Sequence, residues 1–567
     1  MSAISANCFL RRAALSAISL FALTVLLAPS TNAQQSAATA DSSAAAEKAI
    51  ASDPILKAMH EELTRSKSDL KMDNVPAPYY IEYRLFDVEE FDAEAAYGAL
   101  RQNQRIHSRV VRVVVRVGDY KQDSFYGPGS GMVDLAPLEN DPTALRRQLW
   151  LATDRAYKMA NEALAAKKAV MSQYTGAQQY DDFAHAPVLL SIEPLAKLEF
   201  DSAPWIEMIE KSSNLFRGDP KIDYLSSSIR FRAINQYFEN TEGTVTRHGS
   251  SVYAVHLSGS TQAADGMQLE RSPYFVAATA KELPSPQEIE AETQKMIATF
   301  KELRDAPVVE EDYRGPVLFS PDAATDLVTS MIGDNALGNR PKPGESARTT
   351  GDFASNYKGR VLPTFLSVVD DPSMNTFAGK TLIGAYKVDD EGVRAAKVDV
   401  IENGVLQNYL LGRQPIRDFP DSNGHGRAAP GQIPVPSIGN LIVESKDSLA
   451  PDALKKKLTD LCAQEGKEFC YRVETLAGLN PRLLYRLYTK DGHEELVRGA
   501  IFDELDTRTL RNDLVAAGND PLVSNRESNV PATVIAPSLL LDELEVKRTD
   551  AKNAKIPEYP APDLTKY

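Results

Sequence analysis

A long alternation of polar and apolar residues between positions 224 and 260 constrains the fold more than any other feature of the chain. The run YLSSSIRFRAINQYFEN is followed by Thr241-Glu242-Gly243 and then by TVTRHGSSVYAVHLSGS. A period of two gives a strand one apolar and one polar face, and a short turn of small or polar residues joins two such strands. The stretch therefore predicts an antiparallel hairpin with one face in water.

Helix and strand signals alternate through the rest of the first half. The segments PYYIEYRLFDVEEFDA and SRVVRVVVRVGDY are rich in β-branched and aromatic residues, which predicts strands. Asp141-Pro142 and Ser285-Pro286-Gln287-Glu288 each combine an N-cap with a proline in the first turn, so each predicts the start of a helix. We expect a mixed α/β domain over residues 54–311.

The second half has a different character. The acidic loop and short strand in VVEEDYRGPVLFS, at residues 308–320, place a domain boundary near residue 312. Short strand signals with turn residues between them follow: LSVVDDPSM, VDVIENGVLQNYLLG, GNLIVES, LLYRLYTKDGHEELVRGAIFDEL and ATVIAPSLLLDELEVKR. They predict a largely antiparallel β domain over residues 312–548, with a C-terminal tail at 549–567. The expected fold class is α+β.

The N-terminus has the organisation of a secretory signal peptide. Arg11 and Arg12 precede an apolar run at residues 13–28, and small residues follow up to Ala33. The run is shorter than the roughly 20 residues that span a bilayer, and no later segment supplies such a run. We expect a signal peptide at 1–33, a disordered leader at 34–53, no membrane span after cleavage, and an exported protein, periplasmic or secreted.

Charge and length exclude some classes of partner and fold. The formal net charge is −15, and loss of the two arginines of the signal peptide would make it −17. Such an acidic balance disfavours nucleic acid as a partner. More than 500 residues after cleavage favour two or three domains over one core.

Cys462 and Cys470 are the cysteines that remain after signal cleavage. In an oxidising compartment two cysteines this close form a short-loop disulfide, and two buried free thiols are the alternative. A zinc site on this pair alone is disfavoured, because zinc requires three or four ligands and no histidine is nearby.

A search for catalytic motifs finds little. The seven histidines form no His-x-x-x-His or His-Glu-x-x-His pair, and no nucleophile elbow, P-loop or dinucleotide fingerprint stands at a strand-to-helix junction. Residues 320–339, SPDAATDLVTSMIGDNALGN, predict a helix whose middle carries Thr329, Ser330 and Asp334 among apolar residues.

Six segments of the second half, taken in order, resemble the TldD/PmbA family, the metallopeptidase-related proteins also called modulators of DNA gyrase. These are LSVVDDPSM at 366–374, YKVDDEGVRAAKVDVIENGVLQNYLLGR at 386–413, SNGHGR at 422–427, IGNLIVES at 438–445, VRGAIFDEL at 497–505 and IAPSLLLDELEVKR at 535–548. The resemblance implies a zinc site made by His-Glu-x-x-x-His on the helix that opens the second domain and by a cysteine near the C-terminus. It also implies that catalytic chains pair with zinc-less homologues in a peptide-processing heterodimer.

In this chain the implied zinc ligands are replaced. With Gly333 as the anchor, the two histidine positions and the glutamate fall on Thr329, Ser330 and Asp334, and the region 522–538 contains no cysteine. Zinc hydrolysis needs about three protein ligands and a general base, and neutral hydroxyls hold zinc poorly. We therefore expect no cofactor in this chain, whereas the resemblance implies zinc in family relatives. Asp326, Ser330 and Asp334 still allow either an oxygen-rich site for a harder cation or a polar stripe facing water.

Two further clusters stay open to functional and structural interpretations. In SNGHGR, His425 and Arg427 either contact a bound peptide or form a tight turn with an exposed imidazole. The acidic residues at 370–371 and 389–391 either pair as acid and base or stabilise turns next to Pro372 and Gly392.

Three functions follow from these features. The first is a zinc-less, non-catalytic subunit, a pseudoenzyme that binds peptide or protein substrate as a homo- or heterodimer with a homologous chain. The second is an active exported peptidase, for which Ser330 with Asp334 or His425 is the set of weak catalytic candidates, beside Arg427. The third is a non-catalytic binding protein of the cell envelope.

Overall fold

The computed structural model describes residues 47, 48, 50–174, 180–217, 219, 221–550, 554, 555, 557 and 559. The predicted signal peptide and residues 34–46 of the predicted leader lie outside the described residues. The backbone is helical at 47, 48 and 50–52, which differs from the disordered leader expected from composition. Asp53 then caps helix α2 (Pro54–Asp69), because its carboxylate accepts hydrogen bonds from the amides of Ile55 and Leu56.

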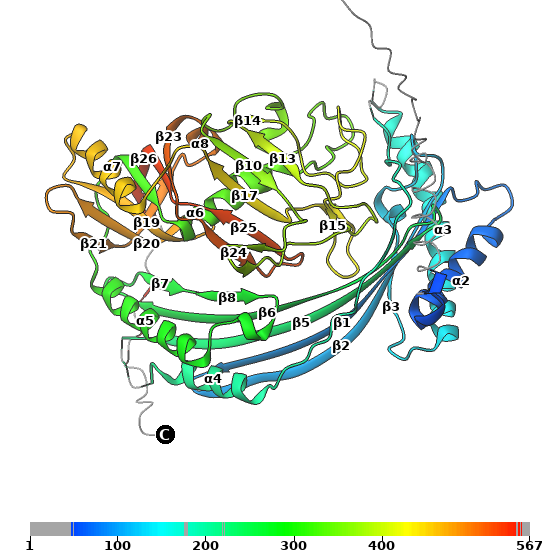
Figure 1. Ribbon diagram of the computed structural model, residues 1–567, viewed down its shortest axis with the longest axis horizontal. Coiled ribbons are helices and arrows are strands. Elements are labelled where there is room, and N and C mark those ends of the chain that lie inside the picture. The colour runs from blue at the N-terminus through cyan, green and yellow to red at the C-terminus, as the bar shows by residue number, and fades with distance from the viewer. Residues whose placement is uncertain are drawn as a thin grey trace, which may run out of the picture. The chain divides into compact units, whose positions relative to one another are not determined.

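The first half of the chain forms one sheet around four long strands. Its strands, in spatial order and within the described residues, are β3 (Met132–Leu135), β2 (Ala99–Arg116), β1 (Tyr80–Ala96), β5 (Tyr224–Asn240), β6 (Val245–Gln262) and β4 (Leu190–Ile192), with β7 (Gln268–Arg271) and β8 (Tyr274–Ala277) also paired to β6. Strands β1, β2, β5 and β6 run the length of the curved sheet in Figure 1. The hairpin predicted for residues 224–260 is confirmed as β5 and β6.

One face of this sheet is apolar and covered by helices. Helices α2 and α3 (Pro142–Met171) pack near one end, and α4 (Ala203–Asn214) and α5 (Pro286–Asp305) pack near the other (Figure 1). The helix starts predicted at Asp141 and Ser285 are confirmed, since Asp141 caps α3 and Ser285 forms a capping box with Glu288. Alternate residues of the strands point to the other face, which is polar and charged.

The second half contains two larger sheets that share no strand with the first. Among the described residues one is ordered β14 (Val405–Leu406), β13 (Val398–Glu402), β10 (Leu366–Asp370), β17 (Asn440–Ser445), β25 (Ala532–Ala536) and β24 (Leu522–Arg526). The other is ordered β18 (Ser448–Leu449), β23 (Leu514–Gly518), β26 (Leu539–Arg548), β9 (Tyr313–Phe319), β19 (Phe469–Ala477), β20 (Asn480–Tyr488) and β21 (Glu494–Val497), with β22 (Ala500–Asp503) beside β26.

Short elements complete the second half. Two small antiparallel pairs join β11 (Thr376–Phe377) to β12 (Lys380–Thr381) and β15 (Gly426–Arg427) to β16 (Val435–Pro436). The helices are α6 (Pro321–Val328), α7 (Pro451–Gln464) and α8 (Thr507–Asp513), and 3₁₀ turns lie at Gly127–Ser130, Ala280–Glu282, Asp334–Ala336 and Asp352–Ser355. Most strand pairs are antiparallel, and β17–β25, β9–β19 and β18–β23 are parallel. The α+β class is confirmed.

The helix predicted over residues 320–339 is only partly an α-helix. α6 ends at Val328, and Thr329–Gly333 form a π-turn in which the amide of Asp334 bonds to the carbonyl of Thr329, five residues back. A π-turn inserts one residue per turn, so it places residues five apart above one another. Periodicity in the sequence did not reveal this change of helix type.

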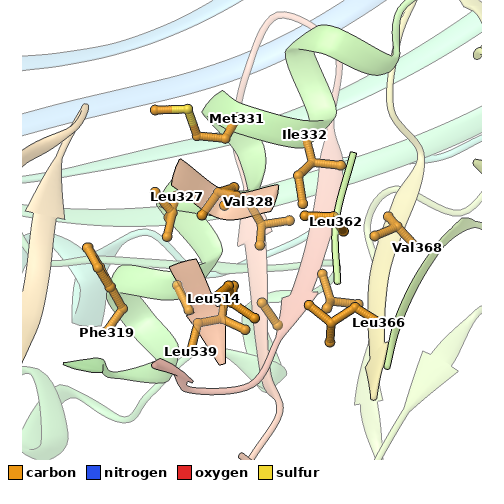
Figure 2. Packing of buried hydrophobic residues seen from close by; sticks show 14 of the residues in the cluster. Phe319, Leu327, Val328, Met331, Ile332, Leu362, Leu366, Val368, Leu514 and Leu539 are labelled. Carbon is orange, nitrogen blue, oxygen red and sulfur yellow. The ribbon is translucent and has the colours of Figure 1, made fainter. Parts of the chain in front are cut away.

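The apolar side of α6 and the π-turn lies in the core of the second half. Figure 2 shows Leu327, Val328, Met331 and Ile332 among buried side chains from other elements, including Phe319, Leu362, Leu366, Val368, Leu514 and Leu539. All of these side chains are at most 5% exposed. The segment is therefore held by hydrophobic burial on one side, and its polar residues occupy the other.

The structure contains a disulfide between Cys462 and Cys470, which joins the end of α7 to β19. Both cysteines are fully buried against Leu458 and Leu540. Within the part of the chain that the structure describes, no helix has both the length and the apolar character needed to cross a membrane.

Candidate functional site

A cleft of about 930 Å³ lies between elements of the first and second halves. The first half contributes β7, β8 and α5, and the second half contributes α6, β12, β19, β20 and β24. Many charged side chains line it: Glu270, Arg271, Glu282, Glu292, Lys295, Asp322, Asp326, Lys380, Arg472, Glu474 and Arg482. Apolar walls come from Phe275, Val276, Leu283, Leu476, Leu483 and Leu522. A concave site with apolar walls and several polar groups is suited to binding a small or extended ligand.

Of the residues that replace the expected zinc ligands, Thr329 and Ser330 lie on the π-turn at the end of α6, and Asp334 begins the 3₁₀ turn that follows. The Thr329 hydroxyl donates to the carbonyl of Thr325, one turn earlier. No hydrogen bond joins the side chains of Ser330 and Asp334 among the described residues. Partial burial raises the pKa of Asp334, and the nearby charge of Arg526 opposes that rise.

Arg526, at the end of β24, places a fixed positive charge beside α6. Its Nη2 atom lies 2.7 Å from Asp326 Oδ1 and 3.1 Å from the hydroxyl of Thr325. The next two residues bind the polar face of the first sheet: Glu527 Oε2 lies 3.0 Å from His256 Nε2, and the carbonyl of Ser528 accepts from Arg232. The turn after β24 therefore contacts both α6 and the first sheet.

Two more carboxylates lie near the start of α6. Glu474 is ion paired with Arg472, whose other Nη atom lies 2.7 Å from Glu494. Asp322 has no side-chain hydrogen bond or ion pair among the described residues, and it lies close enough to Asp326 and Glu474 to feel their charge. Desolvation in the cleft and these two neighbours raise the pKa of Asp322. Repulsion of this kind favours a bound proton or a bound donor.

The donor set at α6 does not fit zinc. Thr329 and Ser330 offer neutral hydroxyls, and Asp326 is already bound to the guanidinium of Arg526. A fixed guanidinium repels a divalent ion at this range. The described residues contain no group of three or more His, Cys, Asp or Glu side chains arranged to hold a metal ion. We therefore derive no chemical step through a metal.

His425 lies elsewhere in the second half and is fully buried. Its Nε2 lies 3.2 Å from Asp370 Oδ1, and its Nδ1 lies 3.0 Å from Asn423 Oδ1. The expectation of an exposed imidazole in a tight turn is wrong, because the rest of the second half covers this loop and buries the imidazole completely. The histidine also makes no hydrogen bond to Ser330 in the described chain, so the structure does not join these two candidates.

Arg427 meets a carboxylate of its own chain rather than an open cleft. Its Nε lies 3.3 Å from Asp390 Oδ2, and its guanidinium stacks 4.0 Å from the ring of Tyr386. Asp389 accepts from the amides of Glu391 and Val393 as a turn residue does, and also from the amide of Gly426. The acidic residues at 389–391 are therefore buried parts of a loop network, and burial raises the pKa of Asp389 and Glu391.

Asp370 and Asp371 have different surroundings: Asp371 stabilises a turn, and Asp370 belongs to a buried hydrogen-bond network. The Asp371 carboxylate accepts from the amide and hydroxyl of Ser373, which is turn chemistry. The Asp370 carboxylate is fully buried and accepts from the amides of Gly439 and Asn440 as well as contacting His425. Neither residue lines the cleft.

Sequence comparisons identify relatives of part of the chain. The profile of a family described as the PmbA/TldA metallopeptidase C-terminal domain matches residues 312–548. A metalloprotease of Methanocaldococcus jannaschii is 27% identical over 132 residues, which are 23% of this chain and 27% of that protein. A metalloprotease PmbA homolog of Haemophilus influenzae is 23% identical over 262 residues, 46% of this chain and 54% of that protein. The chain thus spans between a quarter and about half of the length of these curated relatives.

Solved structures share the fold over most of the chain. TldE from Thermococcus kodakarensis superposes with a TM-score of 0.57 at 12% identity, over 86% of this chain and 100% of that one. A candidate modulator of a DNA gyrase from Thermotoga maritima gives a TM-score of 0.56 at 16% identity, over 86% of this chain and 99% of that one. At these identities the likeness concerns the fold.

Proposed function

Because this chain belongs to the TldD/PmbA family, we propose that it is the zinc-less, non-catalytic subunit of an assembly that processes peptides outside the cytoplasm. In this proposal the cleft beside α6 binds peptide, and a homologous partner subunit supplies the metal and the hydrolytic step.

The ion pair between Arg526 and Asp326 carries the proposal. It occupies the carboxylate of Asp326, about one turn before Thr329 and Ser330, with a positive charge from β24. β24 lies at the start of the region 522–538, where the family resemblance implies a cysteine ligand. Thr329, Ser330 and Asp334 then offer too few strong donors for zinc. The cleft beside α6 has apolar walls and several polar groups, as a peptide site requires.

Two observations support export. Residues 1–33 have the basic, apolar and small-residue order of a signal peptide. The disulfide between Cys462 and Cys470 is of the kind that persists in oxidising compartments. Cell fractionation tests this part of the proposal: we expect the protein outside the cytoplasm with an N-terminus close to residue 34, and a cytoplasmic chain that retains residues 1–33 would contradict it.

Metal content tests the loss of zinc. The purified protein is incubated with excess zinc, freed of unbound metal and analysed by inductively coupled plasma mass spectrometry, and its hydrolysis of a mixed peptide library is followed in parallel. We expect far less than one zinc per chain and no hydrolysis. About one tightly held zinc per chain, with hydrolysis that a chelator abolishes, would show an active metallopeptidase instead.

The partner is tested by reconstitution with an exported homologue that carries His-Glu-x-x-x-His. We expect a heterodimer on size-exclusion chromatography and faster peptide hydrolysis than the homologue shows alone. If the two chains remain separate at micromolar concentration and the rate does not change, the subunit role is wrong, and a binding protein that acts alone becomes the better description.

A further inference from the structure

Arg271, at the end of β7, is the unusual side chain of the cleft. Three arginines line the cleft, and two of them are ion paired: Arg472 with Glu474 and Glu494, and Arg482 with Glu270 at 3.9 Å. The guanidinium of Arg271 has no hydrogen bond and no ion pair to any described residue, although the side chain is partly buried. A desolvated guanidinium without a partner carries an electrostatic cost that a bound anion would offset.

The surroundings of Arg271 do not supply that anion. Burial lowers the pKa of Arg271, while Glu292, Tyr485, Asp322 and Glu474 favour its charged form from a longer range. Glu292 lies 3.7 Å from Lys295, and Glu474 is bound by Arg472. Of the nearby carboxylates, Asp322 alone lacks a partner within the described chain, and it approaches the cleft from the other half of the protein. Arg271 and Asp322 are thus an unpaired cation and an unpaired anion facing the same space.

The backbone holds Arg271 in place. Arg271 is the strand partner of Gly259 in β6, so this end of β7 is held against a long strand of the first sheet. Apolar residues, Phe275, Leu476 and Leu483 among them, stand around the same cleft. A ligand that satisfies these groups carries a carboxylate, a nearby N–H and an apolar portion, which is the chemistry of a peptide. The planar fork of a guanidinium matches a carboxylate with two parallel hydrogen bonds.

We propose that the cleft recognises peptides through a carboxylate bound to Arg271, with an N–H of the same peptide facing Asp322. This inference rests on the proposed function, because it places a peptide in the same cleft, and it adds the determinant of specificity. The carboxylate has two possible sources, the C-terminus of the peptide and an acidic side chain. The chemistry at Arg271 is the same for both.

Isothermal titration calorimetry with three N-acetylated peptides tests the proposal on the full protein. The first is acetyl-Ala-Leu-Ala-Ala-Leu with a free C-terminus, the second is its C-terminal amide, and the third is the amide of acetyl-Ala-Leu-Glu-Ala-Leu. We expect the neutral amide to bind at least about tenfold more weakly than one of the two anionic peptides, since a bidentate charged contact is lost. Preference for the first peptide identifies a terminal carboxylate as the ligand, and preference for the third identifies a side chain.

Variants assign the effect to Arg271. R271Q should remove the preference for the anionic peptide, and R271K should keep part of it. R314Q, which alters an exposed arginine outside the cleft, should leave the preference within about twofold of wild type. Unchanged thermal unfolding of each variant shows that the fold is intact. Equal binding of all three peptides, no binding at millimolar concentration, or a preference that survives R271Q would overturn the proposal. Zinc content is measured on the same preparation, so an active metallopeptidase is recognised independently of this result.

Discussion

Arg526 Nη2 lies 2.7 Å from Asp326 Oδ1, although the two residues are 200 positions apart in the chain. The contact joins β24 to α6, the helix that precedes Thr329, Ser330 and Asp334. Both side chains are largely buried, and the guanidinium also binds the Thr325 hydroxyl. The charge of Asp326 is therefore compensated by an arginine of the same chain.

Removing Arg526 should leave an uncompensated carboxylate beside α6. We expect R526Q to lower the free energy of unfolding by about 1–2 kcal/mol, since it breaks a partly buried charged hydrogen bond. Thermal unfolding of R526Q, D326N and the double variant measures the coupling between the two residues. If the effects of the single variants simply add, the contact contributes no coupling energy and the assigned role of Arg526 fails.

The pair between Arg413 and Glu242 should contribute more. It is bidentate, with distances of 2.7 and 2.9 Å, and the guanidinium also donates to the carbonyl of Ala184 and lies 4.0 Å from the Phe183 ring. We expect R413M to cost roughly 3–5 kcal/mol, because it leaves Glu242 poorly solvated. The matched control is R314M, which breaks the exposed pair with Glu543 and should change the free energy of unfolding far less than R413M does. Similar losses in the two variants would contradict the difference in burial.

Glu90 should make stability depend on pH. Burial and a hydrogen bond with Asp92 raise the pKa of Glu90 from 4.5 to about 7, against the opposing charges of Arg230 and Arg232. The folded chain therefore holds this proton more tightly than the unfolded chain does. Its contribution to stability is present below pH 4.5 and is lost as the pH rises towards 7.

The variant E90Q remains neutral at every pH and tests this dependence. Compared with wild type it should be about equally stable at pH 4 and more stable at pH 8, by roughly 1–2 kcal/mol once solvent screening is allowed for. Thermal unfolding of both proteins at the two pH values gives the answer, and E89Q, on the opposite face of β1, is the control. An E90Q stability difference that is the same at both pH values would contradict the assignment.

The disulfide should stabilise the second half modestly. The bond closes a loop with a sequence separation of 8, for which loss of chain entropy in the unfolded state predicts about 2–3 kcal/mol. We expect C462A/C470A to unfold at lower temperature than wild type. Reductant present during unfolding should lower the midpoint of wild type and leave that of the double variant unchanged. A wild-type midpoint insensitive to reductant would show that the bond contributes little.

Local features of the fold were predictable from sequence because they depend on neighbouring residues. Asp141 and Ser285 cap their helices, and the alternation at 224–260 forms β5 and β6. In each case residues within a few positions decide the outcome. The resemblance of six ordered segments then indicated the family, which local patterns do not reveal.

The site was less predictable because its contacts join distant parts of the chain. Arg526 contacts Asp326 only in the folded protein. The local sequence RESNVP, at residues 526–531, does not distinguish this arginine from one that is exposed to solvent. The burial of His425 depends on Asp370, which is 55 positions away. Arg271 stands out only when its neighbours are known to be paired already. The π-turn also escaped prediction, because its apolar spacing resembles that of an α-helix.

Leu327, Val328, Met331 and Ile332 pack in the core, as Figure 2 shows, and they hold the backbone of this segment in place. The polar residues that could contact ions or ligands lie on its other side. Substitutions on its buried side open cavities or create clashes, which cost several kcal/mol. Substitutions on the opposite side, at Thr329, Ser330 and Asp334, change which ions and ligands are accepted but leave those apolar contacts in place. A chain built in this way can exchange one set of polar side chains for another while its backbone stays where it was. Such a scaffold offers a starting point for introducing a designed metal or ligand site.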